Sequence, residues 1–348
     1  MRANAFREQD LLNFTRELAF STTGGLDVRA AVRTIEEQST REAVRLVARR
    51  LSMSLSTQPV LSEALADQPD VFDPLFVGVV RAGERSGKLA DSLDRLARLL
   101  DQGSLTRGAL WRALKYPTLC TGVAGAVVLA LLALVIPQFA SIYQSMNVEL
   151  PAATRALLWS STAVVEGWPL MLLASIGLWQ LTVRCARFAG VRRAAGAAVT
   201  SMPIVGSVAR HGTAARTYGS IHTCLASGSS ILEALSLVES SPHTAAAHRD
   251  LTLARRAIER GDSLAGALRG CRTLPRGDVA LLSVGAEAGN LEGMLDLLNR
   301  VHLAALEAAV GRCTALAEPV VIVGMGLVIG SIVLAVFMPN VRFINNVG

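Results

Sequence analysis

Charged and aromatic residues are scarce in this sequence. Of its 348 residues only 18% are charged and 5% are aromatic, whereas 51% are hydrophobic. Ordinary soluble domains carry about a quarter charged residues. A soluble fold of this length would have difficulty burying so much apolar surface, so we expect an integral membrane protein whose excess apolar residues face lipid or partner helices.

The chain also lacks the residue patterns that catalysis and metal binding use. Its five cysteines are odd in number and contain no CxxC pair, which argues against a disulfide framework and a zinc site. Its five histidines show no HExxH or other ligand spacing, and no GxSxG elbow is present. We therefore predict no catalytic, cofactor-binding or metal-binding residue, and a protein that is not an enzyme and uses no cofactor.

The formal net charge is +6, for which nucleic-acid binding and a membrane location are competing explanations. Cytoplasmic flanks of membrane spans carry excess Lys and Arg, and the basic residues here gather around the apolar segments. We favour the membrane explanation and expect no direct nucleic-acid partner. Met1 to Phe14 is charged and polar, without the apolar core of a signal peptide, which predicts a cytoplasmic N-terminus.

Two apolar segments are long enough to cross a bilayer. Thr118 to Ile136 and Val320 to Met338 each contain 19 residues without a charge, close to the ~20 residues that a transmembrane helix needs. A proline stands at each end of both segments, where we expect the chain to enter and leave the membrane: Pro117, Pro137, Pro319 and Pro339.

A third apolar stretch, from Ala156 to Val183, is interrupted by Glu166. An ionised carboxylate at the bilayer centre costs about 3 kcal/mol, so we place Glu166 at the membrane edge. Basic residues precede the first span and follow the second, whereas the loop between them, residues 137–166, holds one Arg and no Lys. The positive-inside rule then places the loop outside and both large polar regions inside.

These segments divide the chain into cytoplasmic, membrane and periplasmic regions. The predicted order is a cytoplasmic helical domain (1–116), a transmembrane helix (117–137), a periplasmic loop (138–166), a second transmembrane helix (167–187), a second cytoplasmic helical domain (188–317), a third transmembrane helix (318–339) and a short periplasmic tail (340–348). The C-terminus is therefore expected in the periplasm of a multi-pass inner-membrane protein.

The two cytoplasmic regions repeat one another. Gly24 to Ala30 matches Gly228 to Ala234, and later glycines, leucines and prolines match at an offset that drifts only from 204 to 202. Ordered matches at a nearly fixed offset over roughly 120 residues indicate a duplicated structural unit. Apolar residues recur with helical spacing, as in 41–51 and 89–100, and no segment shows sustained strand alternation. The predicted fold class is all-α: two homologous cytoplasmic helical-bundle domains and three transmembrane helices.

Gly83 to Leu89 resembles a phosphate-binding loop only superficially. Three residues separate its glycines instead of four, and Leu89 stands where a Ser or Thr should follow the lysine. We instead predict a tight turn between helices, with Ser86 capping the next helix. The residues assigned to this turn in the two repeats are Gly83, Glu84, Gly87, Gly285, Glu287 and Gly289.

Two further groups of residues are candidate contact sites. Small residues in the first and third predicted spans would allow close helix packing. They are Gly122 and Ala126 in the first span and Gly326 and Gly330 in the third. Arginines follow one face of a predicted helix in each repeat, where a solvated face and a partner contact are both possible explanations. These candidate partner-contact arginines are Arg41, Arg45, Arg49, Arg249, Arg256 and Arg260.

Several of these motifs together resemble the GspF/PilC family of type II secretion and type IV pilus platform proteins. The resemblance covers about residues 10–345 and includes the Gly83 to Leu89 turn and Tyr116-Pro117 before the first span. It also includes the Glu149 to Arg155 segment, which reads Glu-Leu-Pro-x-x-Thr-Arg, and Glu318-Pro319 before the last span. The second repeat departs from the pattern, because Ala286 follows the first glycine and the acid stands one place later, at Glu287.

The resemblance implies a scaffold without catalytic chemistry. It implies six-helix cytoplasmic bundles, self-association and a position among other inner-membrane platform proteins. It also implies a cytoplasmic assembly ATPase and pilin or pseudopilin subunits as partners. Two other classes remain open from the residues: a transporter or channel with an internal repeat, which would place charge or broken helices in its spans, and a membrane enzyme or sensor.

Overall fold

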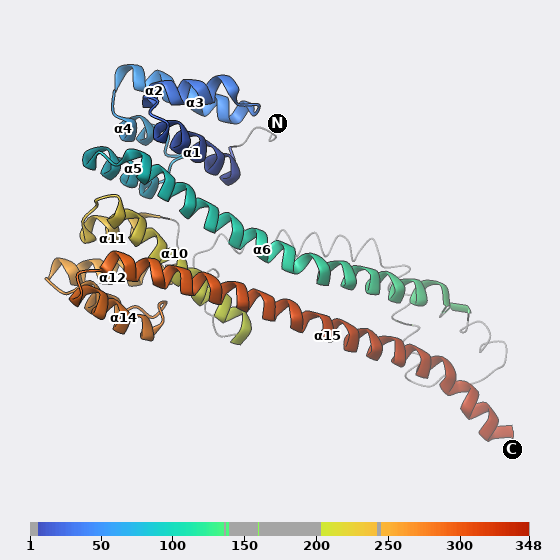
Figure 1. Cartoon of the computed structure of the whole chain (residues 1–348). Coiled ribbons are helices and arrows are strands. Elements are labelled where there is room, and N and C mark those ends of the chain that lie inside the picture. Colours follow the sequence, from blue (N-terminus) through green and yellow to red (C-terminus); the bar gives the residue numbers. More distant parts are fainter. Residues whose placement is uncertain (1–5, 136, 139–158, 160–202, 242–244, 348) are drawn as a thin grey trace. The chain divides into compact units, whose positions relative to one another are not determined.

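The computed structural model describes residues 6–135, 137–138, 159, 203–241 and 245–347, and these residues form helices and no strand (Figure 1). The chain divides into two compact units. We call Met1–Ala109 with Gly196–Ala309 the helical unit, and Leu110–Ala195 with Val310–Gly348 the apolar unit. The all-helical fold class is thereby confirmed for the described residues.

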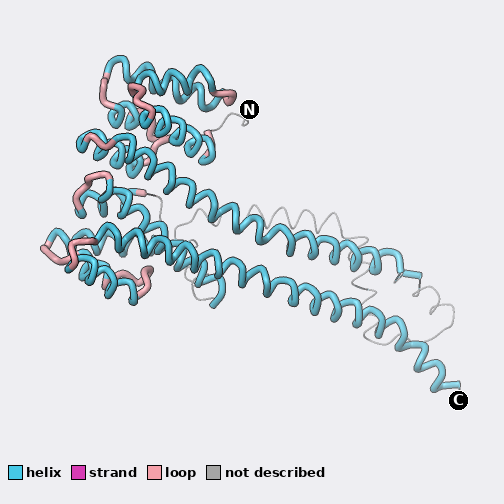
Figure 2. Tube along the Cα trace, viewed as in Figure 1, coloured by secondary structure: helices cyan, strands magenta, loops and turns pink. Residues whose placement is uncertain are grey.

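The helical unit contains two sets of six helices in the same order, and Figure 2 shows them as cyan tubes joined by short loops. The first set is α1 (Glu8–Thr23), α2 (Val28–Gln38), α3 (Glu42–Thr57), α4 (Leu61–Ala66), α5 (Pro74–Ser86) and the start of α6 (Leu89–Ala130). The second set is α10 (Pro203–Ala226), α11 (Ile231–Ser240), α12 (Ala245–Glu259), α13 (Leu264–Leu268), α14 (Arg276–Glu287) and the start of α15 (Leu291–Val347). The duplication seen in the sequence is therefore a duplication of helices.

The structure shifts the first part of the repeat by one residue. Gly25 and Gly228 occupy the same turn, with φ of 84° and 98°. Asp27 and Ser230 then stand at the N-caps of α2 and α11. The offset is thus 203 in this turn, and the match of Gly24 with Gly228 was wrong by one. Two adjacent glycines made the choice ambiguous, and only the backbone conformation resolves it.

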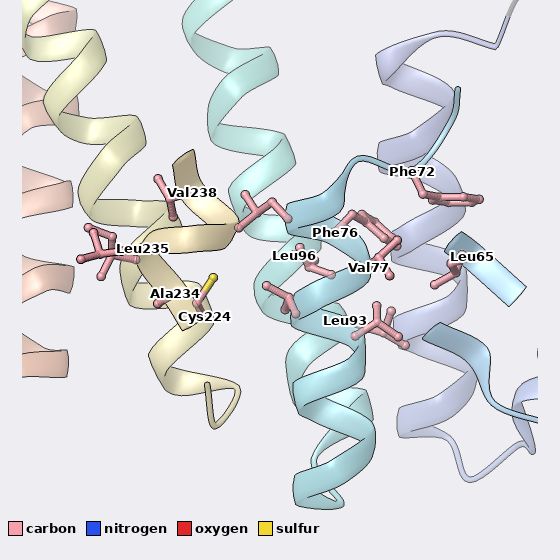
Figure 3. Packing of buried hydrophobic residues seen from close by; sticks show 14 of the residues in the cluster. Leu65, Phe72, Phe76, Val77, Leu93, Leu96, Cys224, Ala234, Leu235 and Val238 are labelled. Atoms are coloured by element: carbon pink, nitrogen blue, oxygen red, sulfur yellow. The ribbon is translucent and has the colours of Figure 1, made fainter. Parts of the chain in front are cut away.

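One hydrophobic core serves both sets of helices. Buried side chains of α1 to α6 and of α10 to α15 belong to the same cluster, and Figure 3 shows Phe76 and Leu96 of the first set together with Leu235 and Val238 of the second. Burying a side chain of this size contributes about 1.5–3 kcal/mol. The two predicted cytoplasmic domains therefore form a single compact unit.

The apolar unit contains the later parts of α6 and α15. Among the described residues one helix is long and apolar enough to cross a membrane, within Leu291–Leu334, and Thr118–Ala130 is a shorter apolar helix. A π-helical segment, η1 (Leu131–Val135), follows α6 in the first predicted span. The predicted second span, 167–187, lies outside the described residues.

The prolines do not end these helices. Pro117 lies inside α6, and Pro319 and Pro339 lie inside α15. In the predicted membrane segments, a Cβ atom built on Gly122, Gly326 or Gly330 would meet no described atom within 4 Å. The described residues thus form no close helix approach at these glycines, and packing there stays a prediction.

Candidate functional site

The two helical sets meet where α5 packs against α10 and α11. A glycine makes this approach possible, because a Cβ at Gly78 would lie 2.4 Å from both methyl carbons of Leu237. No side chain fits at that distance. The duplicated halves therefore join through a specific close contact between α5 and α11.

Polar contacts surround this junction. The Ser86 hydroxyl donates to the Ser227 carbonyl oxygen (3.1 Å), and Arg85 pairs with Glu233 at 2.6 Å. Farther along, the Asn299 amide donates to Gln102 Oε1 (3.2 Å). Ser86 thus joins the repeats instead of capping the next helix, so the prediction of a cap at this residue was wrong.

The glycine motif has two separate structural roles. Gly87 and Gly289 have φ of 69° and 68°, the left-handed conformation that ends α5 and α14. Glycine adopts this conformation without the steric cost that a side chain would bring. Gly83 and Gly285 lie inside those helices and let the following helix approach closely. A Cβ at Gly83 would meet Ser92 Oγ at 2.5 Å, and one at Gly285 would meet Met294 Cβ at 2.7 Å.

The carboxylate of Glu84 caps a different helix from the one that carries it. It accepts hydrogen bonds from the backbone N–H groups of Leu61 (2.7 Å) and Ser62 (3.1 Å) at the start of α4. The N-cap residue of α4, Val60, has no side-chain oxygen to do this. Glu84 therefore satisfies donors that the local sequence leaves open, and its negative charge suits a helix N-terminus.

The second repeat replaces this carboxylate with a local cap. Ser263, the counterpart of Val60, accepts a hydrogen bond from the backbone N–H of Gly266 (3.1 Å) at the start of α13. Ala286 can therefore stand in place of Glu84 without leaving that helix uncapped. Glu287 is exposed at the end of α14, so the shifted acid does not take over the capping role.

Four polar side chains of the second set of helices contact one another in series, and we call them the polar chain. Asp278 Oδ2 accepts from the Tyr218 hydroxyl (2.8 Å) and lies 2.8 Å from His302 Nε2, while His302 Nδ1 lies 2.9 Å from His211 Nδ1. Burial, reinforced by the Asp278 carboxylate, raises the pKa of Tyr218 above its ordinary value. No local sequence pattern indicates this polar chain, because its members come from separate helices.

Two buried cysteines of the helical unit are poorly suited to nucleophilic chemistry. Burial raises the pKa of both Cys224 and Cys271 to about 12, and a thiol with so high a pKa is a poor nucleophile at neutral pH. Among the described residues, no group of three or more His, Cys, Asp or Glu side chains could hold a metal ion. Neither Cys224 nor Cys271 is therefore an activated thiol.

The first arginine group is partly engaged within its own repeat. Arg41 precedes α3 and pairs with the buried carboxylate of Asp10, and Arg49 pairs with Glu36 at 3.0 Å. Arg45 is exposed. Arg49 is exposed as well but is engaged with Glu36, and moving Arg41 would uncover a buried charge, so Arg45 is the member of this group best placed to contact another protein.

The second arginine group lies on a different helix face. Arg249, Arg256 and Arg260 are exposed, and the repeat aligns them with Leu46, Met53 and Thr57 and not with the first group. The neighbouring Arg255 pairs with Glu239 at 2.7 Å and also with Glu259. Burial acts to raise the pKa of Glu239, but hydrogen bonds from Thr252 and Arg255 outweigh it and lower that pKa.

Comparison with known families gives one match that covers most of the chain. The family described as Type II secretion system (T2SS), protein F matches residues 14–137 and 219–339. Each matched part starts in the first helix of a six-helix set and ends where the first or the third predicted span ends. The segment that this family describes is therefore present twice in the chain.

Curated relatives match along nearly the whole chain. A Type II secretion system protein F of Xanthomonas campestris is 29% identical, covering 100% of this chain and 86% of the relative. The Type IV pilus assembly protein PilC of Pseudomonas aeruginosa is 26% identical (98% and 92%), and that of Thermus thermophilus is 30% identical (97% and 83%). Proteins named for secretion and for pilus assembly are thus about equally similar.

Proposed function

Because the chain belongs to the type II secretion system protein F family, we propose that it is the inner-membrane platform subunit of a secretion or pilus assembly machine. In this role it couples a cytoplasmic assembly ATPase to the polymerisation of pilin or pseudopilin subunits. The observation that carries the proposal is the paired family match, in which each copy comprises a six-helix set whose last helix continues into an apolar segment.

The arrangement of polar and apolar residues supports a mechanical role over a chemical one. The described residues hold no metal-binding group, and Tyr218, Asp278 and His302 are buried in the helical unit. The helical unit is tied together by a shared core and by the α5–α11 contact. A body of this kind can receive a push at its surface and pass it on without an internal reaction.

The membrane arrangement that fits this role has three spans, a cytoplasmic N-terminus and a periplasmic C-terminus. Its support is the distribution of Lys and Arg around the apolar segments. Reporters that are active only in the periplasm should work when fused after Ser145 and after Val347. One fused after Arg210 should be silent, and activity there would overturn this topology.

Exposed arginines of the helical unit are the proposed contact with an acidic surface of the ATPase or of a neighbouring platform protein. Arg45 on α3 and Arg256 and Arg260 at the end of α12 are exposed. Charged contacts of this kind chiefly set orientation and the rate of encounter. Binding should therefore weaken with added salt, because exposed charges are screened over ~8–10 Å at physiological ionic strength.

Charge reversal at these positions tests the contact. Arg45→Glu, and Arg256→Glu with Arg260→Glu, should each reduce filament assembly without lowering the amount of protein in the membrane. Arg50→Glu is the matched control, because Arg50 is exposed on α3 outside the first arginine group. Normal assembly by both variants would place the ATPase contact elsewhere.

Copurification and transport measurements test the function itself. Chain isolated from its native membrane should bring down a secretion-type ATPase and pilin-like proteins, and its deletion should abolish secretion or surface filaments. A transporter or channel would instead move a solute across vesicles containing the purified chain. Solute flux without copurifying assembly proteins would overturn the proposal.

A further inference from the structure

The contact between the two helical sets occurs once in this chain, although the helices that form it are present in both sets. In the helical unit, α5 of the first set packs against α10 and α11 of the second. The equivalent helices are α14 on one side and α1 with α2 on the other. Among the described residues, α14 has no comparable packing against α1 or α2. Each half of the duplicated contact is therefore left without its partner.

The face of α14 is the first unpaired half. Gly78, Val79 and Ala82 of α5 are buried at the junction, but their counterparts Ala280, Leu281 and Val284 are exposed, Val284 to 58%. Beside them lies an open hollow of about 470 Å³, lined by Arg269, Arg276, Val279, Ala280 and Ser283. We call Ala280, Leu281 and Val284 the α14 face.

The end of α1 and the turn into α2 form the second unpaired half. In the second set, Thr223 and Ser229 are buried beside the junction. Their counterparts in the first set are Phe20, which is 83% exposed, and Leu26, which is 44% exposed. We call Phe20 and Leu26, with the exposed side of α2, the α1–α2 edge. Its large apolar side chains lie open where equivalent positions of the second set are covered.

Size and charge match between these two halves. The counterparts of Gly78 and Leu237 are Ala280 and Thr34. Ala280 is larger than Gly78 and Thr34 is smaller than Leu237, so the two changes in size compensate each other. The Arg85–Glu233 pair corresponds to Glu287 and Ala30, and the exposed Arg29 and Arg33 flank Ala30 on α2. At the positions equivalent to this ion pair, an acid thus stands at the end of α14 and bases stand on the α1–α2 edge, with the signs exchanged relative to the internal junction.

We propose that the α14 face of one copy of this chain docks on the α1–α2 edge of a second copy, as α5 docks on α10 and α11 within the chain. The two surfaces differ, so the contact is head-to-tail, and copies add in one direction until a ring closes. The occupant of the exposed apolar surface is therefore a second copy of the chain. The contact needs neither an ATPase nor a pilin.

Two complementary variants of the full-length chain, purified in detergent, test the proposal by native mass spectrometry. Val284→Asp blocks the α14 face, and Phe20→Asp blocks the α1–α2 edge. Each should weaken self-association by about tenfold or more, because a charge is forced into an apolar contact. Leu253→Asp is the control, since Leu253 is 59% exposed on α12 outside both surfaces, and it should associate like the unmodified chain.

Mixing the two blocked variants gives the decisive result. Each retains the half that the other lacks, so the mixture should form a heterodimer that grows no further. Glu287→Arg should weaken association, and adding Arg29→Glu and Arg33→Glu should restore it. Thermal unfolding like that of the unmodified chain verifies that the variants are folded.

Three outcomes would overturn the inference: an unmodified chain that stays monomeric, association unaffected by both blocking variants, or blocked variants that do not pair on mixing. Because these measurements use the purified chain alone, they are independent of the proposed function. Failure of assembly in cells with intact self-association would count against the function and not against this contact.

Discussion

The two six-helix sets share their order of helices but fill equivalent positions of the core differently. In the first set, Phe72 packs between Phe14 and Phe76, with ring centroids 5.9 and 5.1 Å apart. The position of Phe76 is taken in the second set by Asp278, which holds Tyr218 and His302. The same fold thus tolerates either an aromatic cluster or a series of hydrogen-bonded side chains at this position. The second arrangement requires that the buried polar atoms in that series have hydrogen-bond partners.

A second difference between the sets concerns the capping of their fourth helices. The first set uses a distant carboxylate, Glu84, and the second uses the local hydroxyl of Ser263. Both satisfy backbone donors at the start of a short helix. After the duplication, the structural requirement was kept while the residue that meets it changed.

Among these predictions, breaking the polar chain at Asp278 should have the largest effect on stability. Asp278→Ala removes the acceptor of Tyr218 and the partner of His302, so we expect a loss of about 3–5 kcal/mol in the free energy of unfolding. Chemical denaturation of the purified chain in detergent would measure it. Asp262→Ala, at an exposed position of the same set, should cost less than about 0.5 kcal/mol.

The same site offers a way to sharpen the comparison. The triple variant Asp278→Leu, Tyr218→Phe, His302→Leu makes the second core apolar like the first, and it should recover most of the stability lost in Asp278→Ala. A triple variant that is less stable than Asp278→Ala would show that the polar chain cannot be replaced by packing.

The left-handed glycines should behave alike in the two sets. Gly87→Val and Gly289→Val each force a β-branched residue to positive φ, which should cost about 1–2 kcal/mol. Gly103→Ala is the control, since Gly103 lies inside α6 with no atom within 4 Å of its Cβ position. Denaturation curves of Gly87→Val and Gly289→Val unchanged from the parent would mean that these turns carry no conformational strain.

The two caps should be interchangeable. Glu84→Ala leaves the start of α4 without its acceptor and should cost about 1 kcal/mol. Adding Val60→Ser, which copies Ser263 into the first set, should restore most of that loss. Glu17→Ala, an exposed acid of α1, serves as the control. No gain from Val60→Ser would show that Glu84 acts through something other than the cap.

The smallest effect is expected at the ion pair between the sets. Arg85 and Glu233 are 59% and 36% exposed, and pairs of this kind contribute about 0.2–1 kcal/mol. A double-mutant cycle with Arg85→Ala and Glu233→Ala should measure this coupling and find it reduced in high salt. Coupling that is insensitive to salt would indicate that the pair is shielded from solvent.

Local sequence patterns are enough to predict the helical class, the duplication and the apolar segments at the ends of α6 and α15. Each of these follows from spacing or composition within one stretch of chain, such as the recurring glycines at Gly83, Gly87, Gly285 and Gly289. The same local information placed Arg45 and Arg49 on a helix, whereas Arg41 lies just before α3. It did not reveal that Arg41 and Arg49 are paired, because Asp10 and Glu36 lie on other helices.

Only the tertiary structure decided which residues meet. The cap from Glu84 to α4, the approach of Leu237 to Gly78, and the chain from Tyr218 through Asp278 to His302 all join separate helices. Helical periodicity fixes the face on which a residue lies, but not the helix that will cover that face. That choice depends on how the whole set of helices packs, so the shared core of the two repeats could not be predicted from either repeat alone.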